Sequence, residues 1–476
     1  MSEKLINIKT LPVIKEIKGE QVNGLYRINK YSAQINDESG LFEKEIKVFR
    51  QYAYKSKNLN FTDGNRGIHI INDSTLSDEA YRMNFSDTVN IFVSTGKGLS
   101  YAFSSLLQIM ENQNNKLNMP AAEFYDYPES SHRGLMIDLA RKFHPVKYIF
   151  KYIDMCYLYK INRLQLHFTD DQGYTLPSKK FPKLPVKDEH YSENEIEDIV
   201  KYADERHITL IPEIDMPGHC AKFIDAYPEI FGVNGVMSAD DIVFEALDKL
   251  YGELCLMFPN SPYIHIGGDE AAVSNWENCP RSREYMKNNN IKTIEDLYSE
   301  FIKKGTEIIF RHGRTPIVWE GFHKSGNVRI SKDVIVISWE NYYQTAPELL
   351  EDGFTLINAS WKPLYIVTPA PAWTSEEILS WNRYSWRHWW EKSKAYPDGI
   401  DVDPSSKITG GQICAWGDNL TKYESGEKAS AEEHQMVRER IPALAEKTWN
   451  INSDIQINTY NDIFRLADDI YEKMSS

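Results

Sequence analysis

The sequence has few cysteines, and no two of them stand at a metal-binding spacing. Five cysteines occur among 476 residues, which is an odd number, and no Cys-x-x-Cys pair is present. Disulfide frameworks generally use even numbers of cysteines, and zinc sites use closely spaced pairs. We therefore expect free thiols rather than a disulfide framework or a zinc site.

The sequence also lacks an excess of basic residues and any long apolar run. Lys and Arg number 54 against 69 Asp and Glu, so the formal net charge is −15. Nucleic-acid binding needs clustered positive charge, so this balance argues against a nucleic-acid partner. Lys and Glu interrupt every apolar run in residues 1–20. We therefore expect no signal peptide, no membrane span and a cytoplasmic chain.

The length suits two domains, and the pattern of the chain changes at residues 112–120. Before this polar stretch, β-branched segments at 67–71 and 89–93 predict strands, and the apolar spacing of 99–110 predicts a helix. We expect a small N-terminal α+β domain over residues 1–125 and a second domain over residues 126–476.

In the second domain, short apolar segments alternate with amphipathic helical segments. The predicted strands are 134–139, 163–168, 208–214, 263–266, 316–319, 334–339, 354–358 and 411–415, and the predicted helices include 146–160, 193–206, 244–258, 294–311 and 431–447. Strands that alternate with helices form parallel βαβ units, and eight such units predict a (β/α)8 TIM barrel. The alternative is an open doubly wound sheet, but the first strand lacks the glycine-rich loop that usually follows in that fold.

Acids, histidines, tryptophans and one arginine lie at the carboxyl ends of the predicted strands, where a barrel places its active site. They are Asp138, Arg141, His167, Asp170, Asp171, Glu213, Asp215, His219, His265, Asp269, Glu270, Trp319, Glu320, Trp339, Glu340, Trp416 and Asp418. Any one of them is compatible with a helix cap or a solvated loop, but a purely structural barrel has no need for the whole set. The histidines lack the paired spacing of a zinc helix, so we predict no metal and no cofactor. Carboxylates with aromatic walls favour glycoside hydrolysis.

The most informative segment is YIHIGGDE, in which an apolar strand ends in two glycines and then in Asp269 and Glu270. Glycines allow a tight turn and close approach of a ligand. Consecutive side chains on an extended backbone diverge, so the two acids are predicted to do different jobs.

Four motifs in this order resemble glycoside hydrolase family 20, the β-N-acetylhexosaminidases. They are DLAR at 138–141, HFTDDQGY at 167–174, PEIDMPGH at 212–219 and HIGGDE at 265–270. The resemblance covers residues 126–450 and extends more weakly into the N-terminal domain. It implies a retaining mechanism in which the 2-acetamido group of the substrate attacks the anomeric carbon and forms an oxazolinium ion.

The resemblance also implies roles for individual residues. Glu270 is expected to be the general acid and then the base, with its pKa raised by burial and by nearby negative charge. Asp269 is expected to stay ionised and to orient the acetamido group, while Asp170 and His219 assist proton transfer. The other residues matched to the family are expected to bind the sugar. Arg141 is expected to hold the hydroxyls of the sugar, and Tyr365 to donate a hydrogen bond to the acetamido oxygen. Trp319, Trp339 and Trp416 are expected to form a box around the acetamido methyl group.

Two positions depart from the family pattern. Val367 stands where the family often has Asp, and Asp418 stands where it often has Glu; both positions usually bind hydroxyls around positions 4 and 6 of the sugar. We therefore expect either tolerance of both glucose- and galactose-configured sugars or a different 6-substituent. The aromatic stretch 373–390 is interpreted in two ways: as part of the leaving-group subsite with Trp381 or Trp386 as a platform, or as a surface-packed loop.

The sequence therefore predicts an exo-acting enzyme that removes terminal N-acetylglucosamine or N-acetylgalactosamine from an oligosaccharide. A lacto-N-biosidase of the same family, which removes a disaccharide, is the second candidate. A non-catalytic carbohydrate-binding barrel is the third, but a pure binding protein has no use for an acid with a tuned pKa. The residues do not define an oligomeric state.

Overall fold

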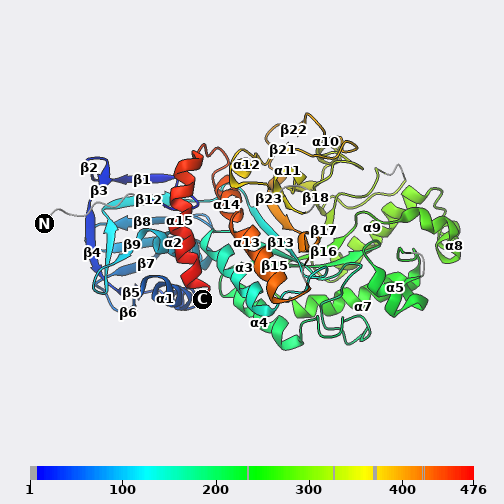
Figure 1. Ribbon diagram of the computed structural model, residues 1–476, viewed down its shortest axis with the longest axis horizontal. Helices are drawn as coiled ribbons and strands as arrows, with labels where there is room; N and C mark the ends of the chain where they lie inside the picture. Colours follow the sequence, from blue (N-terminus) through cyan, green and yellow to red (C-terminus); the bar gives the residue numbers. More distant parts are fainter. Residues whose placement is uncertain (1–7, 233–234, 325–326, 368–372, 421, 423) are drawn as a thin grey trace.

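The computed structural model describes residues 8–232, 235–324, 327–367, 373–420, 422 and 424–476. Figure 1 shows two parts side by side, a smaller sheet-containing domain formed by the N-terminal residues and a larger barrel. The smaller domain has a seven-stranded sheet in the order β1 (Glu16–Gly19), β12 (Ala122–Asp126), β8 (Tyr81–Phe85), β9 (Val89–Val93), β7 (Ile68–Asn72), β5 (Gln34–Asp37) and β6 (Thr62–Asp63). Helix α2 (Gly96–Ile109) packs against β8 and β9. The two strands and the helix predicted for this region are confirmed as β7, β9 and α2.

Eight parallel strands form a closed barrel after this domain. They are β13 (His132–Asp138), β14 (Arg163–His167), β15 (Thr209–Met216), β16 (Tyr263–Gly267), β17 (Thr315–Trp319), β18 (Ile335–Ser338), β19 (Thr355–Asn358) and β23 (Ile408–Ala415). They pair in sequence order, and β13 also pairs with β23, so the sheet has no free edge among them. The predicted (β/α)8 barrel is confirmed, with a strand in each of the eight segments, and the open sheet is wrong.

The helices of the barrel largely follow the sequence pattern. Four of the predicted helices are confirmed as α3 (Val146–Leu158), α4 (Glu193–Asp204), α7 (Asp241–Met257) and α9 (Ile294–Arg311). The single helix predicted over 431–447 is wrong, because the structure has α13 (Glu427–Arg438) and then α14 (Ile441–Trp449). Pro442 lies in the first turn of α14. Proline has no amide hydrogen and clashes inside a helix, so it suits a new start and ends the preceding one.

Between the last two barrel strands, the chain makes a long excursion at the carboxyl end of the barrel. It contains α11 (Trp361–Leu364), β20 (Tyr365–Ile366), α12 (Ser375–Leu379), β21 (Ser385–Trp386) and β22 (Ile400–Asp401). Strand β20 pairs in parallel with the end of β23, with Tyr365 opposite Cys414. This pairing sets Tyr365 beside Trp416, so the excursion completes one wall of the rim.

The C-terminal helix α15 (Ile457–Met474) connects the two parts of the molecule. It packs against α1 (Glu43–Lys57) and α2 of the N-terminal domain and against α3 of the barrel, and it appears in red across this junction in Figure 1. Within the described part of the chain, no helix has both the length and the apolar character that crossing a bilayer requires.

A buried ion pair holds the N-terminal domain to the barrel. Asp126 at the end of β12 accepts hydrogen bonds from Lys160 Nζ at 2.9 Å and from Trp449 Nε1 at 2.8 Å. Tyr81 donates to the same carboxylate at 2.7 Å. The side chains of Asp126 and Lys160 are both fully buried. Such a pair is costly to break from one side, because the remaining charge is left unpaired in the interior.

Asp126→Asn is therefore expected to lower the free energy of unfolding by about 3–5 kcal/mol. Urea denaturation followed by tryptophan fluorescence measures this change. The matched control is Asp469→Asn, which removes a carboxylate from the exposed pair with Lys473; the expected change is below about 0.5 kcal/mol. Equal changes in the free energy of unfolding for the two variants would show that Asp126 does not stabilise the contact between the N-terminal domain and the barrel.

Candidate active site

A pocket opens at the carboxyl end of the barrel, where the sequence placed the active site. Its volume is about 90 Å³. Nine of the ten predicted site residues line it: Arg141, Asp170, His219, Asp269, Glu270, Trp339, Tyr365, Trp416 and Asp418. The tenth, Trp319, is not among the lining residues. His167, Asp215, Trp361 and Val367 complete the lining.

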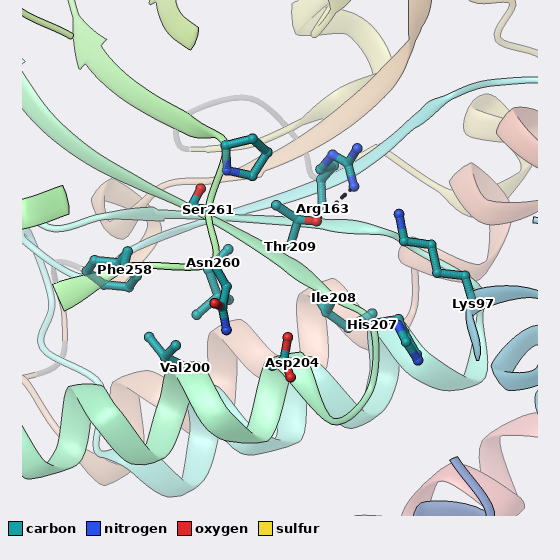
Figure 2. A pocket seen from close by; sticks show the side chains of 12 residues that line it. Lys97, Arg163, Val200, Asp204, His207, Ile208, Thr209, Phe258, Asn260 and Ser261 are labelled. Atoms are coloured by element: carbon teal, nitrogen blue, oxygen red, sulfur yellow. Dashed lines mark hydrogen bonds between the residues drawn. The ribbon is translucent and has the colours of Figure 1, made fainter. Parts of the chain in front are cut away.

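A larger hollow of about 270 Å³ lies at the opposite end of the barrel strands. Arg163 and Thr209, at the starts of β14 and β15, line it together with Lys97 of the N-terminal domain (Figure 2). None of the predicted site residues reaches this hollow. The chemistry of the lining, rather than pocket size, therefore identifies the rim as the active site.

The turn after β16 presents the two central acids in different directions. Gly267 and Gly268 have φ angles of 68° and 103°, in the region that favours glycine. A Cβ atom on Gly267 would come within 2.4 Å of an Asp215 carboxylate oxygen. The glycines thus let the strand end bend tightly over β15. As a result Asp269 is buried, whereas the side chain of Glu270 is 53% exposed at the mouth of the pocket.

Glu270 stands at the end of a chain of contacts that begins at Asp170. One oxygen of Asp170 lies 3.2 Å from His219 Nδ1, at hydrogen-bond distance, and His219 Nε2 lies 3.6 Å from an oxygen of Glu270. The predicted association of these three residues is present in this geometry. An imidazole between two carboxylates can hold a proton and pass it on.

The charges of the two acids differ from the sequence expectation. The hydrogen-bonding position of His219 lowers the pKa of Glu270, against burial, so the predicted increase of this pKa is wrong. Burial raises the pKa of Asp269 to about 7, so full ionisation at neutral pH was also wrong for the free protein. The reason is that His219 faces Glu270 directly, while one carboxylate oxygen of Asp269 is buried without a hydrogen-bond partner. In the unliganded protein, the proton therefore resides on His219: burial opposes its charge, but contacts with Asp170 and Glu270 hold its pKa well above the ordinary value.

Arg141 is fixed by three carboxylates. Its guanidinium nitrogens lie 3.0 Å from Asp138, 2.8 Å from Asp170 and 3.5 Å from Asp418. Asp138 also accepts the backbone N–H groups of Arg141 and Gly417, at 2.9 and 3.0 Å, and so ties the turn after β13 to the turn after β23. Arg141 is thus a rigid donor fork in the pocket wall, as sugar hydroxyls require.

Aromatic rings form another part of the pocket wall, and the Arg141 guanidinium lies over the ring of Trp416, 5.0 Å from its centroid. Tyr365 stacks on Trp339 with a centroid distance of 5.7 Å and on Trp361 with a distance of 4.6 Å. Trp416 lies 6.1 Å from Tyr365 and 5.8 Å from Trp319. Trp319 therefore supports the box from behind, with its indole N–H donated to buried Glu213 at 2.7 Å. Trp361, which begins the short helix α11 after β19, also belongs to this wall but was not predicted. Its only signal in the sequence is its place four residues before Tyr365.

The positions that depart from the family pattern both reach the pocket. Val367 is buried in its lining and presents an apolar surface, and Asp418 contacts Arg141. The proposal that Trp381 or Trp386 forms a leaving-group platform is wrong. Both side chains are buried, with exposures of 4% and 0%, because Trp381 packs over Gly411 and Trp386 donates its indole N–H to Ser338. A buried ring has no free face for a sugar.

Histidine and carboxylate donor atoms also approach one another closely in this pocket. In sets such as His219 with Asp269 and Glu270, they lie within 4.8 Å of one another. The ring nitrogens of His167 and His219 each already lie within 3.6 Å of a carboxylate oxygen. We therefore assign these groups to a proton-transfer network, for which paired acids and imidazoles are suited, and give none of them the role of a metal ligand.

The comparison with protein families agrees with this geometry. Residues 130–452 match the catalytic domain of glycosyl hydrolase family 20, and residues 8–127 match domain 2 of the same family. The chain belongs to glycosyl hydrolase family 20. This family 20 protein is thus a glycoside hydrolase.

Named relatives support the same assignment. A β-hexosaminidase from Akkermansia muciniphila is 30% identical over 365 residues, which are 70% of this chain and 71% of that protein. A β-hexosaminidase from Porphyromonas gingivalis is 32% identical over 298 residues, but the match spans only 38% of its length and 56% of this chain.

Solved structures share the fold of this family 20 chain. A β-N-acetylhexosaminidase from Bacteroides fragilis superposes with a TM-score of 0.78 and 24% identity, over 96% of this chain and 94% of that one. An exo-β-N-acetylglucosaminidase from Vibrio harveyi, in complex with N-acetylglucosamine, has a TM-score of 0.83 and 21% identity, over 99% of this chain and 79% of that one.

Proposed function

We propose that the protein is an exo-acting, retaining β-N-acetylhexosaminidase that releases terminal N-acetylglucosamine or N-acetylgalactosamine from oligosaccharides. The observation that carries the proposal is the division of the two acids: Glu270 faces solvent beside His219, and Asp269 lies buried in the lining of the same pocket with one oxygen unpartnered. An acetamide N–H is the kind of donor that would satisfy this oxygen.

In the proposed reaction, the 2-acetamido oxygen of the substrate attacks the anomeric carbon. The bond between the anomeric carbon and the leaving oxygen breaks as that oxygen takes a proton from Glu270. Glu270 receives this proton from His219. Asp269 accepts the acetamide N–H and balances the positive charge of the oxazolinium ion. Water then opens this ion, with Glu270 as the base, and the configuration at the anomeric carbon is retained.

The walls of the pocket support this assignment of roles. Trp339, Tyr365 and Trp416 line the same pocket as Asp269 and contact one another, so they can hold the acetamido group close to the anomeric carbon. Fixing an internal nucleophile in this way replaces a bimolecular encounter by a proximity effect. Arg141 is the donor that faces the ring hydroxyls.

Alternative assignments receive less support. The relatives from Akkermansia muciniphila and Porphyromonas gingivalis are both named β-hexosaminidase, which does not favour a lacto-N-biosidase. A carbohydrate-binding barrel would not need an acid coupled to a protonated imidazole. A side-by-side assay of aryl N-acetylglucosaminide, N-acetylgalactosaminide and lacto-N-bioside tests the proposal. We expect cleavage of the first or the second; cleavage of the lacto-N-bioside alone would contradict it.

The acidic side of the pH profile is expected to report Asp269. Its carboxylate must be charged to stabilise the oxazolinium ion, and burial raises its pKa to about 7 in the free protein. The pH dependence of kcat/KM reports the pKa values of the free enzyme. We therefore expect kcat/KM to be high above this pKa and to fall as the pH decreases through about 7. Stopped assays of an aryl N-acetylglucosaminide between pH 4 and 10 measure the profile. A flat profile down to about pH 4, the range of an ordinary carboxyl, would contradict the raised pKa.

A further inference from the structure

A second set of buried charged groups lies directly behind the Asp170–His219 pair. Glu213, on β15, is fully buried in the barrel. Its carboxylate accepts hydrogen bonds from Gln165 at 2.7 Å and Trp319 at 2.7 Å, and its other near neighbours are His167 Nδ1 at 3.0 Å and His265 Nδ1 at 2.9 Å. None of the proposed reaction steps uses this carboxylate or its two histidines. A buried charge of this kind is expensive, so its position calls for an explanation.

His167 joins Glu213 to the proton-transfer network. Its Nδ1 atom faces Glu213, and its Nε2 atom lies 3.0 Å from the Asp170 oxygen that also contacts Arg141. The other Asp170 oxygen contacts His219. The continuous series is therefore Glu213, His167, Asp170, His219 and Glu270, with successive contacts of 3.0, 3.0, 3.2 and 3.6 Å.

The groups around His167 favour its protonated form. Besides Glu213 and Asp170, Asp215 faces it from β15, and the ring of Trp416 packs edge-on at 5.1 Å. Burial alone would remove the charge, but the carboxylates hold the pKa of His167 well above its ordinary value. Asp170 is consequently shared among three cationic neighbours, namely Arg141, His167 and His219.

We propose that His167, kept protonated by Glu213, is a positioning residue that limits how tightly Asp170 binds the proton on His219. Because this proton supplies Glu270, His167 sets the pH above which the enzyme loses its general acid. A third cation on Asp170 weakens the attraction between Asp170 and His219, and so makes His219 a better proton donor. The groups that face His219 itself are Asp170, Asp215, Asp269 and Glu270. The inference rests on the proposed function, since it concerns the proton used there.

The test is the variant His167→Gln, assayed as kcat/KM against pH on an aryl N-acetylglucosaminide. Glutamine can still donate to Asp170 but carries no charge. With one cation fewer, Asp170 should hold the His219 proton more tightly, so the basic limb of the profile should move up by about one pH unit. KM should change little. A change in packing alone would alter rates at every pH without moving the limb.

The matched control is His132→Gln, the same substitution at another buried histidine of the barrel. His132 lies at the start of β13 and contacts Gln412 at 3.1 Å, and burial lowers its pKa to about 3, so the substitution removes no charge. The basic limb of this variant should coincide with that of the wild type. An unmoved limb in His167→Gln, or an equal shift in both variants, would overturn the inference.

A direct measurement of His167 covers the case in which the variant does not fold. Nitrogen-15 NMR of the wild-type protein should show both ring nitrogens of His167 protonated at pH 7, and Glu213→Gln should make the ring neutral there. A neutral His167 in the wild type would overturn the inference. Failure of the proposed function is distinguishable, because it would appear as a wild-type protein without activity on the aryl substrates, whatever the state of His167.

Discussion

Glu270→Gln is expected to lower kcat/KM for an oligosaccharide β-N-acetylglucosaminide by about a thousandfold, within the range attributed to general acid catalysis. Glutamine keeps the size of the side chain and its place beside His219, but it has no proton to give to the leaving oxygen. The loss should shrink for aryl substrates whose leaving groups need no protonation. A series of substrates with leaving groups of decreasing acidity measures this dependence.

The control for this variant is rescue by a small anion. In Glu270→Ala, azide should restore turnover of an activated aryl substrate and give a β-glycosyl azide, because an anionic nucleophile needs no general base in the second step. Circular dichroism should show an unchanged fold, since the Glu270 side chain is half exposed. Wild-type rates in Glu270→Gln on a poor leaving group would remove Glu270 from the mechanism.

Asp269→Asn is expected to lower kcat/KM by about 10²–10³, the scale seen when one electrostatic partner of a charged intermediate is removed. The amide has nearly the shape of the carboxylate but cannot balance the oxazolinium charge, and its NH₂ group would face the acetamide N–H. Aryl substrates should not escape this loss, because the defect lies in the nucleophile rather than in the leaving group. The contrast with Glu270→Gln separates the two roles.

Asp171→Asn is the comparison for this second variant. Asp171 follows Asp170 in the chain, but its carboxylate accepts the backbone N–H of Ala221 at 3.0 Å and does not line the pocket. Its kcat/KM should stay within a factor of a few of the wild type. If Asp269→Asn were no worse than Asp171→Asn, buried Asp269 would have no part in stabilising charge.

The sequence predicted the parts of the fold that depend on local pattern. The eight barrel strands are short apolar segments, most of them separated by helices, and this pattern was sufficient to find them. The break at Glu439 and Arg440 was missed, because the apolar spacing runs on through 431–447 while Pro442 decides where the second helix begins. Strand β20 was also missed, since two residues paired with the end of β23 leave no periodic signal.

For the site, the sequence identified the residues but not their charges. Nine of the ten predicted residues line the pocket. Five of them stand in the four motifs, Trp339, Trp416 and Asp418 lie at or just after the ends of predicted strands, and Tyr365 was assigned through the family resemblance alone. The pKa of Glu270 is lowered and that of Asp269 is raised, opposite to the prediction for each. Both values depend on which of the two acids His219 faces, and no spacing in the sequence shows this. The burial of Trp381 and Trp386 was not visible in the sequence either. Their residue type suggested a sugar platform, but both side chains are buried in the fold and cannot stack on a sugar.

The central claim is that the acetamido group of the substrate is the nucleophile, and fluorination of its methyl group tests this most directly. Fluorine withdraws electrons from the acetamido oxygen without adding much bulk, so kcat/KM for aryl N-acyl-glucosaminides should fall steadily from acetyl to trifluoroacetyl, by roughly a hundredfold or more if the attack loses about 3 kcal/mol. The first-formed sugar should be the β-anomer by proton NMR. A rate independent of the number of fluorine atoms, with the β-anomer still formed first, would show that an enzyme group performs the attack and would contradict the roles assigned to Asp269 and Glu270.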